Sequence, residues 1–144
     1  MKRKILSLLL AVAMFCMLTF SVSAAEQQPI EELEISPRYT YLNSLSAYAE
    51  KGNGFITYTG DCVVRPTDED LTLKVSLQES TDRITWTTVD SKTREYAIAT
   101  GGHGLSGEYY SPIKGRYYRC LTMVWVGDPD NPIDSGSVAK IIQY

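Results

Sequence analysis

The sequence predicts an all-β protein: an antiparallel sandwich of about seven short strands, preceded by an N-terminal signal helix that is cleaved. The first 25 residues have the layout of a secretory leader. From Tyr39 onward, apolar and polar residues alternate in short runs separated by turn-forming residues, which is the pattern of half-buried strands. Two cysteines, Cys62 and Cys120, fall on the second and sixth of these runs.

The leader is residues 1–25. A basic stretch at residues 1–4 precedes an apolar run at residues 5–22, and small residues then allow cleavage after Ala24 or Ala25. We expect cleavage after Ala25, because polar chain begins at Glu26. The alternative is an uncleaved membrane anchor, since the run is long enough to cross a bilayer. A lipoprotein is disfavoured, because Phe15 stands where a small residue should precede Cys16.

Removal of the leader changes the charge of the protein. It takes away three of the 14 basic residues and none of the 17 acidic ones, which leaves 11 against 17 and a formal charge of −6. An acidic chain without a Lys/Arg block is a poor ligand for nucleic acid or for anionic membranes. We therefore expect an exported protein with a protein or glycan partner, with no nucleic acid and no membrane after signal cleavage.

Residues 26–38 are acidic and carry two prolines, so we expect a flexible lead-in followed by one domain at 39–144. The first expected strand is 39–50, and glycines at 52 and 54 turn the chain into a second strand at 55–65, which Pro66 ends. The third, 71–78, alternates Leu and Val with Thr, Lys, Ser and Gln. This strict alternation is the clearest strand signal in the chain.

The second half predicts four more strands. Residues 83–89 place Ile84 and Trp86 on one face, and 94–100 form a short strand. The glycine-rich 101–108 is expected to be a loop, and 114–126 a long strand. The proline- and aspartate-rich 127–136 forms a turn before a last strand at 137–144.

Tyr118 lies two residues before Cys120, in the sequence GRYYRC. This spacing, with cysteines on the second and sixth of seven strands, resembles the immunoglobulin-like and fibronectin-like sandwiches. The resemblance implies that Tyr118 forms a tyrosine corner and that the two cysteine-bearing strands face each other. It is not of antibody type, because Arg116 replaces a small residue and the third strand has no Trp.

The leader, the ISPRYTYL entry at residues 35–42 and the single small β domain also resemble a family of exported single-domain proteins of Gram-positive, clostridial-type bacteria. That resemblance implies secretion through the general route and carries over no site residue.

Once Cys16 leaves with the leader, Cys62 and Cys120 form an even pair in an exported chain. We expect them to form a disulfide, because exported proteins enter compartments in which disulfides persist. The alternative is a pair of free buried thiols.

No pattern predicts catalysis or a cofactor. The only histidine, His103, cannot hold zinc alone, and with Ser106 it lies in the expected flexible loop, where a triad lacks rigid positioning. The acids at residues 68–70 read as a solvated turn. Asp128, Asp130 and Asp134 supply oxygen ligands suited to Ca²⁺, but two prolines interrupt them and the EF-hand pattern is missing.

One face of the sixth strand is unexpectedly apolar for a solvent side. It carries Tyr117, Arg119, Leu121, Met123 and Trp125. This face is either a binding surface or is covered by another segment of the chain. We expect a non-catalytic binding module of unknown ligand; the alternatives are a carbohydrate-binding module and a secreted antagonistic, toxin-like domain.

Overall fold

The computed structural model describes residues 39–97 and 100–144. The predicted signal peptide, its Ala24 and Ala25 cleavage sites and the lead-in at 26–38 lie outside the described residues. Within these ranges no helix is long and apolar enough to cross a membrane.

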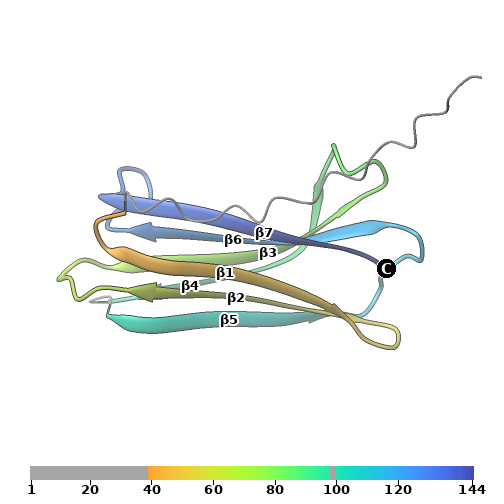
Figure 1. Cartoon of the computed structure of the whole chain (residues 1–144), viewed down its shortest axis with the longest axis horizontal. Helices are drawn as coiled ribbons and strands as arrows, with labels where there is room; N and C mark the ends of the chain where they lie inside the picture. Colours follow the sequence, from red (N-terminus) through yellow and green to blue (C-terminus); the bar gives the residue numbers. More distant parts are fainter. Residues whose placement is uncertain (1–38, 98–99) are drawn as a thin grey trace, which may run out of the picture.

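Seven antiparallel strands form two sheets, as the sequence predicts (Figure 1). One sheet has the order β1-β2-β5, and the other has the order β4-β3-β6-β7. The strands are β1 (Leu42–Lys51), β2 (Ile56–Val64), β3 (Leu71–Ser80), β4 (Thr87–Tyr96), β5 (Gly101–Tyr109), β6 (Tyr117–Val126) and β7 (Asp134–Gln143).

The core lies between the sheets and follows the alternation of the sequence. On β6 every second residue is buried, and on β3 both parities are largely buried because its outward Thr72 and Ser76 lie beside the large Trp125 and Leu121 of β6. The largest side chains that are fully buried are Tyr58, Tyr118, Ile56, Leu71, Leu73 and Leu77.

The two lateral sides of the sandwich are closed differently. On one side β1 lies against β7, where a carboxylate oxygen of Asp134 accepts the backbone N–H groups of Tyr41 and Leu42 at 2.8 and 3.0 Å. On the other side, side-chain hydrogen bonds join β4 to β2 and β5. The Tyr58 hydroxyl donates to Asp90 at 2.7 Å, and the Tyr96 hydroxyl lies 3.4 Å from the carbonyl oxygen of Gly104.

The predicted fourth and fifth strands are wrong in position. Residues 83–86 lie in a connection, and one strand, β4, runs from Thr87 to Tyr96 along β3. The physical reason is a tight turn: the Asp82 carboxylate accepts the N–H groups of Ile84 and Thr85, both at 2.8 Å, and Arg83 has φ of 63°. This local hydrogen bonding competes with strand pairing.

The predicted loop at 101–108 is also wrong, because this segment is the strand β5, paired with β2 along its whole length. Two of its glycines, Gly104 and Gly107, do not make the segment a loop. They leave space for side chains of β2. A Cβ at Gly107 would collide with the Tyr58 ring, and one at Gly104 would collide with the Asp61 carboxylate. Close approach of a neighbouring group is a reason for glycine inside a strand.

The predicted disulfide does not form. Cys62 and Cys120 are both free and buried. The two strands run in the same direction in facing sheets, as Figure 1 shows, but the cysteines are at different levels. Gly60 lies against Thr122, and the Cys120 thiol lies 3.4 Å from the carbonyl oxygen of Thr59.

Because β2 and β6 run in the same direction and Gly60 faces Thr122, Cys120 of β6 faces Tyr58 of β2. Tyr58 is four residues before Cys62. At about 3.3 Å per residue this offset is roughly 13 Å, well beyond the separation of about 7 Å that a disulfide tolerates. Facing strands are thus not sufficient for a bridge, since the register between the sheets also has to match.

Candidate functional site

The outer face of β6 is defined by Tyr117, Arg119, Leu121, Met123 and Trp125. Strand β6 lies between β3 and β7, and its opposite parity fills the core. All five outer side chains are half-buried, so they are neither fully solvated nor fully covered. The structure therefore brings these residues together on one sheet face, and it places them between rows from the neighbouring strands.

Those neighbouring rows consist mostly of short or polar side chains. On β3, Thr72 lies beside Trp125, and Ser76 lies beside Leu121. On β7, Ser135 and Ser137 lie beside Trp125 and Met123. Because residues directly opposite each other in a sheet are in contact, the large β6 side chains shield Thr72 and Ser76, which are buried although they point outward, whereas Ser135 and Ser137 are exposed.

Arg119 is held rigidly at one end of this face. Its Nε donates to Oε1 of Gln78 at 2.6 Å, and its guanidinium lies 4.5 Å from the centre of the Trp86 ring. The amide nitrogen of Gln78 in turn donates to the Thr88 hydroxyl at 3.1 Å. Burial lowers the pKa of Arg119 from its ordinary value, but a guanidinium stays charged at any physiological pH.

The connection between β3 and β4 covers this end of the face in part. Trp86 belongs to it, and Arg83 lies over the Tyr117 ring at 5.3 Å. Sequence patterns did not assign Trp86 to this face, because the expected strand placed it beside Ile84 instead. Only the β3–β6 register brings Gln78 to Arg119, since 41 positions separate them in the chain.

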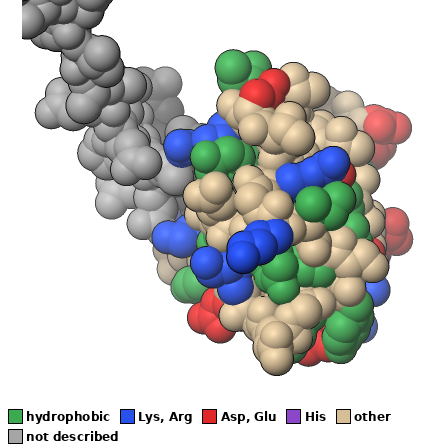
Figure 2. Space-filling model, turned by 90° about the vertical axis from the view of Figure 1, so that its right-hand side faces the viewer, with side chains coloured by type: hydrophobic (Ala, Val, Ile, Leu, Met, Phe, Trp, Pro, Cys, Tyr) green, Lys and Arg blue, Asp and Glu red, His purple; other side chains and the backbone are tan. Residues whose placement is uncertain are grey.

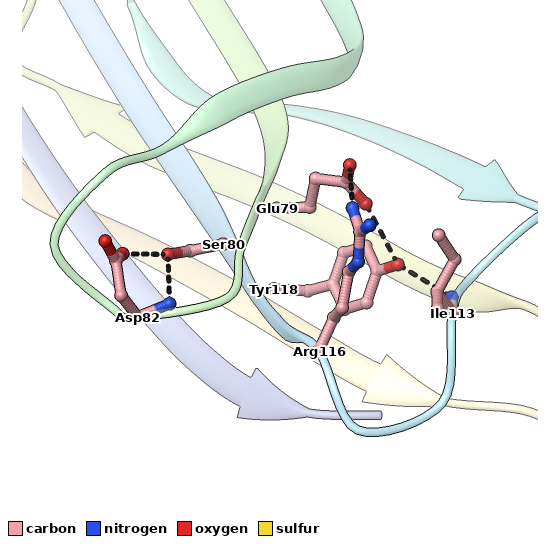
Figure 3. Close-up of polar contacts among 6 residues, drawn as sticks. All are labelled: Glu79, Ser80, Asp82, Ile113, Arg116 and Tyr118. Carbon is pink, nitrogen blue, oxygen red and sulfur yellow. Dashed lines mark hydrogen bonds and ion pairs between the residues drawn. The ribbon is translucent and has the colours of Figure 1, made fainter.

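Tyr118 is fully buried on the core side of β6, and Figure 3 shows its polar contacts. Its hydroxyl accepts the backbone N–H of Ile113 at 2.8 Å and donates to Glu79 at 3.3 Å. Arg116 pairs with the same carboxylate at 2.6 Å. Burial raises the pKa of Tyr118, so the hydroxyl keeps its proton and the β5–β6 connection remains fixed to the core.

A cavity, separate from the outer face of β6, lies at the end of the sandwich where β2 and β6 end. It has a volume of about 600 Å³ and lies between the β2–β3 connection, the end of β4 and the β6–β7 connection. Half of its ten lining residues are acidic: Asp68, Glu69, Asp70, Glu95 and Asp128, with Tyr96 among the others. The turn at 68–70, read from sequence as solvated, thus joins Asp128 in space.

The predicted Ca²⁺ ligands do not converge. Asp134 is occupied by the N–H groups at the start of β1, and Asp128 accepts the N–H of Asp130 at 2.9 Å. Among residues 39–97 and 100–144, no group of three or more His, Cys, Asp and Glu is arranged to hold a metal ion.

His103 and Ser106 do not come together. They lie on β5 with opposite parity, so His103 points towards the core and Ser106 points away from it. The His103 ring packs against Tyr96, with centroids 4.2 Å apart, and its Nε2 is buried without a hydrogen-bond partner in the described part of the chain. Strand β5 therefore positions His103 as a packing residue.

Comparison with known proteins gives fold-level likeness only. No family model matches the chain, and no curated protein matches it. A β-glucuronidase from Parabacteroides merdae aligns with 73% of this chain at 16% identity and a TM-score of 0.45. Bacteroides uniformis β-glucuronidase 2 aligns with 69% at 14% identity and a TM-score of 0.42.

The chain spans 13% of the length of each of these two enzymes. A likeness at this level assigns neither a family nor an activity to the chain.

Proposed function

We propose that this chain is an exported, non-catalytic binding module with an immunoglobulin-like sandwich, acting outside the cell or at its envelope. The leader-like sequence of residues 1–25 supports export. The sandwich differs from an antibody constant domain, in which the fourth strand joins strands 1, 2 and 5, because here β4 extends the sheet of β3, β6 and β7. In this proposal Tyr118 is the tyrosine corner, since its hydroxyl bonds to backbone a few residues upstream.

The outer face of β6 is the proposed binding surface. The observation that supports it is the half-burial of five adjacent large side chains on an interior strand whose other parity is fully occupied by the core. Aromatic side chains, Met and Arg are enriched where proteins bind partners. Arg119, fixed by Gln78 and Trp86, loses little conformational freedom when a ligand binds, which favours affinity.

Carbohydrate is the ligand class that this geometry favours among the alternatives. The Trp125 indole offers a flat apolar surface at one end of the face, while Arg83 lies over the Tyr117 ring at the other end. The exposed Ser135 and Ser137 on β7 supply hydroxyl groups beside Trp125 and Met123. A pocket or groove with a few placed polar groups is the usual design of a small-ligand site, whereas this surface is open and suits an extended chain.

The test is a glycan array together with a pull-down from culture medium, using the protein and a Met123→Ser/Trp125→Ser variant. We expect the wild type to retain a ligand and the variant to lose at least about tenfold in affinity, because hot spots centre on such residues. Tyr48→Ser is the matched control, since Tyr48 is an exposed aromatic residue on the other sheet. If the Met123→Ser/Trp125→Ser variant lost neither binding nor stability, the proposed surface would be wrong.

A further inference from the structure

The two ends of the sandwich carry opposite charge, although the chain as a whole is acidic. Residues 52–55, 81–86 and 110–116 form the connections at one end, and we call this the basic end. They contain Arg83, Lys114 and Arg116 against one acid, Asp82, and Lys51, the last residue of β1, adds a fourth cation. The connections at the other end contain one described cation and five acids: Arg65 against Asp68, Glu69, Asp70, Asp128 and Asp130.

Acids at the strand ends next to the basic end are partly engaged. Glu79 pairs with Arg116, Glu108 accepts the Tyr110 hydroxyl, and Glu50 comes directly before Lys51 at the end of β1. Figure 2 views the molecule from this end, where the Lys and Arg side chains lie near the middle and the Asp and Glu side chains lie around the edge. A flat anionic surface approaching this end would therefore meet cations first.

The same connections expose large apolar side chains. Ile84 is 83% exposed, Tyr110 is 68% exposed and Ile113 is 47% exposed. These are three of the six large hydrophobic residues that the described chain exposes, and two of them lie next to a cation in the chain, Ile84 to Arg83 and Ile113 to Lys114. Single exposed apolar residues are ordinary, but several at one end among cations indicate a surface that is covered in use.

We propose that the basic end docks on an anionic lipid membrane. Cations near such a surface gain from its negative potential, and apolar tips gain by entering the boundary between headgroups and acyl chains. A soluble polyanion would use the cations only and leave Ile84 and Ile113 in water. Tyr117 lies at the basic end, but Met123 and Trp125 lie towards the opposite end of β6, so a docked molecule keeps that part of the outer face accessible.

The composition of the chain does not predict membrane docking. The chain has no Lys/Arg block and a mature charge of −6, so the sequence alone predicts no membrane contact. The cations come instead from four positions spread over 66 residues, and only the antiparallel topology brings them to one end.

The experiment is co-sedimentation of protein secreted into the medium, with its N-terminus identified by mass spectrometry. The vesicles contain either phosphatidylcholine alone or phosphatidylcholine with 30% phosphatidylglycerol, roughly the anionic content at which surface potential matters. We expect binding to the anionic vesicles only, and a loss of binding at high salt. No binding to anionic vesicles, or equal binding to both compositions, would overturn the proposal.

Two variants separate lipid docking from simple charge attraction. Arg83→Glu/Lys114→Glu should weaken binding at least about tenfold, given about 1 kcal/mol for each cation near the surface. Ile84→Ser/Ile113→Ser should weaken it about fivefold through the lost apolar burial. The controls are Lys92→Glu on β4 and Ile133→Ser at the acidic end, both exposed, which should bind as the wild type does.

A fluorescent variant reports insertion directly and needs no loss of function. Ile84→Trp should show a blue-shifted, more intense emission with anionic vesicles, and Ile133→Trp should show none. If the Ile84→Ser/Ile113→Ser variant bound as tightly as wild type while a soluble polyphosphate competed fully, the surface would be a polyanion site and lipid docking would be wrong.

Discussion

Cys62 and Cys120 show how closely the chemistry of a residue depends on its level in the sandwich. Both side chains are almost completely inaccessible, and burial raises the pKa of each thiol to about 11. Since thiolate is the reactive form, both cysteines are protected by a low thiolate fraction as well as by access. Their role in the fold is that of small apolar side chains.

We therefore predict that the folded protein without residues 1–25, which contain Cys16, does not react with a thiol reagent at pH 8, and that the same protein when denatured reacts at two thiols per chain without a reductant. The measurement is absorbance after addition of an aromatic disulfide reagent, before and after guanidinium. Denatured protein that yields no reactive thiol would show that the cysteines are bridged after all.

Thr122 has a buried polar atom that the sandwich does not satisfy. Its side chain is fully buried against Gly60 and Val75, and its hydroxyl oxygen has no hydrogen-bond partner within the described residues. An unsatisfied buried hydroxyl costs about 1–3 kcal/mol. The shape of valine fits the same space without that cost.

Thr122→Val is accordingly expected to raise the free energy of unfolding by about 1 kcal/mol, measured by urea denaturation. Thr93→Val, at an exposed position of β4, controls for the higher strand propensity of valine. Equal effects of the two substitutions would mean that the hydroxyl is satisfied in solution.

Strand β5 illustrates at the scale of the element why sequence reasoning misplaced part of the fold. Glycine runs usually mark loops, so 101–108 was expected to be one. In the structure, glycine is required because Tyr58 and Asp61 on β2 occupy the space beside it. Long-range contacts of this kind leave no local pattern, whereas strongly alternating segments such as β3 and β6 were predicted with nearly their observed bounds.

Two alanine substitutions in β5 test this explanation. Gly107→Ala should destabilise the protein by about 1–3 kcal/mol, because the new methyl group displaces the Tyr58 ring and disturbs its hydrogen bond to Asp90. Gly102→Ala, which meets nothing within 4 Å, should be neutral or stabilise by up to about 1 kcal/mol. Thermal or urea unfolding measures both, and similar losses for the two variants would contradict the packing explanation.

The β3–β4 connection depends on an ionised carboxylate. Hydrogen bonds from the N–H groups of Thr85 and Ile84 lower the pKa of Asp82 to about 2 from an ordinary value of 3.8. A depressed folded-state pKa contributes stability that is present above the unfolded pKa and is lost as the pH falls through the folded one.

Asp82→Ala should therefore lower the melting temperature at pH 5–7, and the difference from the wild type should shrink between about pH 4 and pH 2. Melting curves over this range check the sign. A difference that stays constant down to pH 2 would show that the carboxylate charge has no part in holding the connection.

At the scale of the whole molecule, the sequence predicts the class of the fold and the strand count, but not how the two sheets are set against each other. The predicted disulfide is wrong because the alternation along β2 and β6 gives only which residues point inward. It does not give the register between the two sheets, in which Gly60 faces Thr122. Alternation along β6 likewise predicts which five residues share its outer face. It does not predict the contacts of Arg119 with Gln78 and Trp86, because these residues come from other segments of the chain.

Strand β5 also has a consequence for colloidal behaviour. Within the described chain it pairs only with β2, so its second edge has no strand partner, and of its backbone groups the Gly104 carbonyl oxygen meets the Tyr96 hydroxyl. The register of β1 with β2 and that of β4 with β3 each contain an irregularity, and β7 carries Lys140, whereas β5 has neither a bulge nor a Lys, Arg or Pro. Such features normally prevent edges from recruiting further strands. The glycines that admit Tyr58 thus leave β5 as the edge at which self-association and fibril growth would begin in concentrated solution.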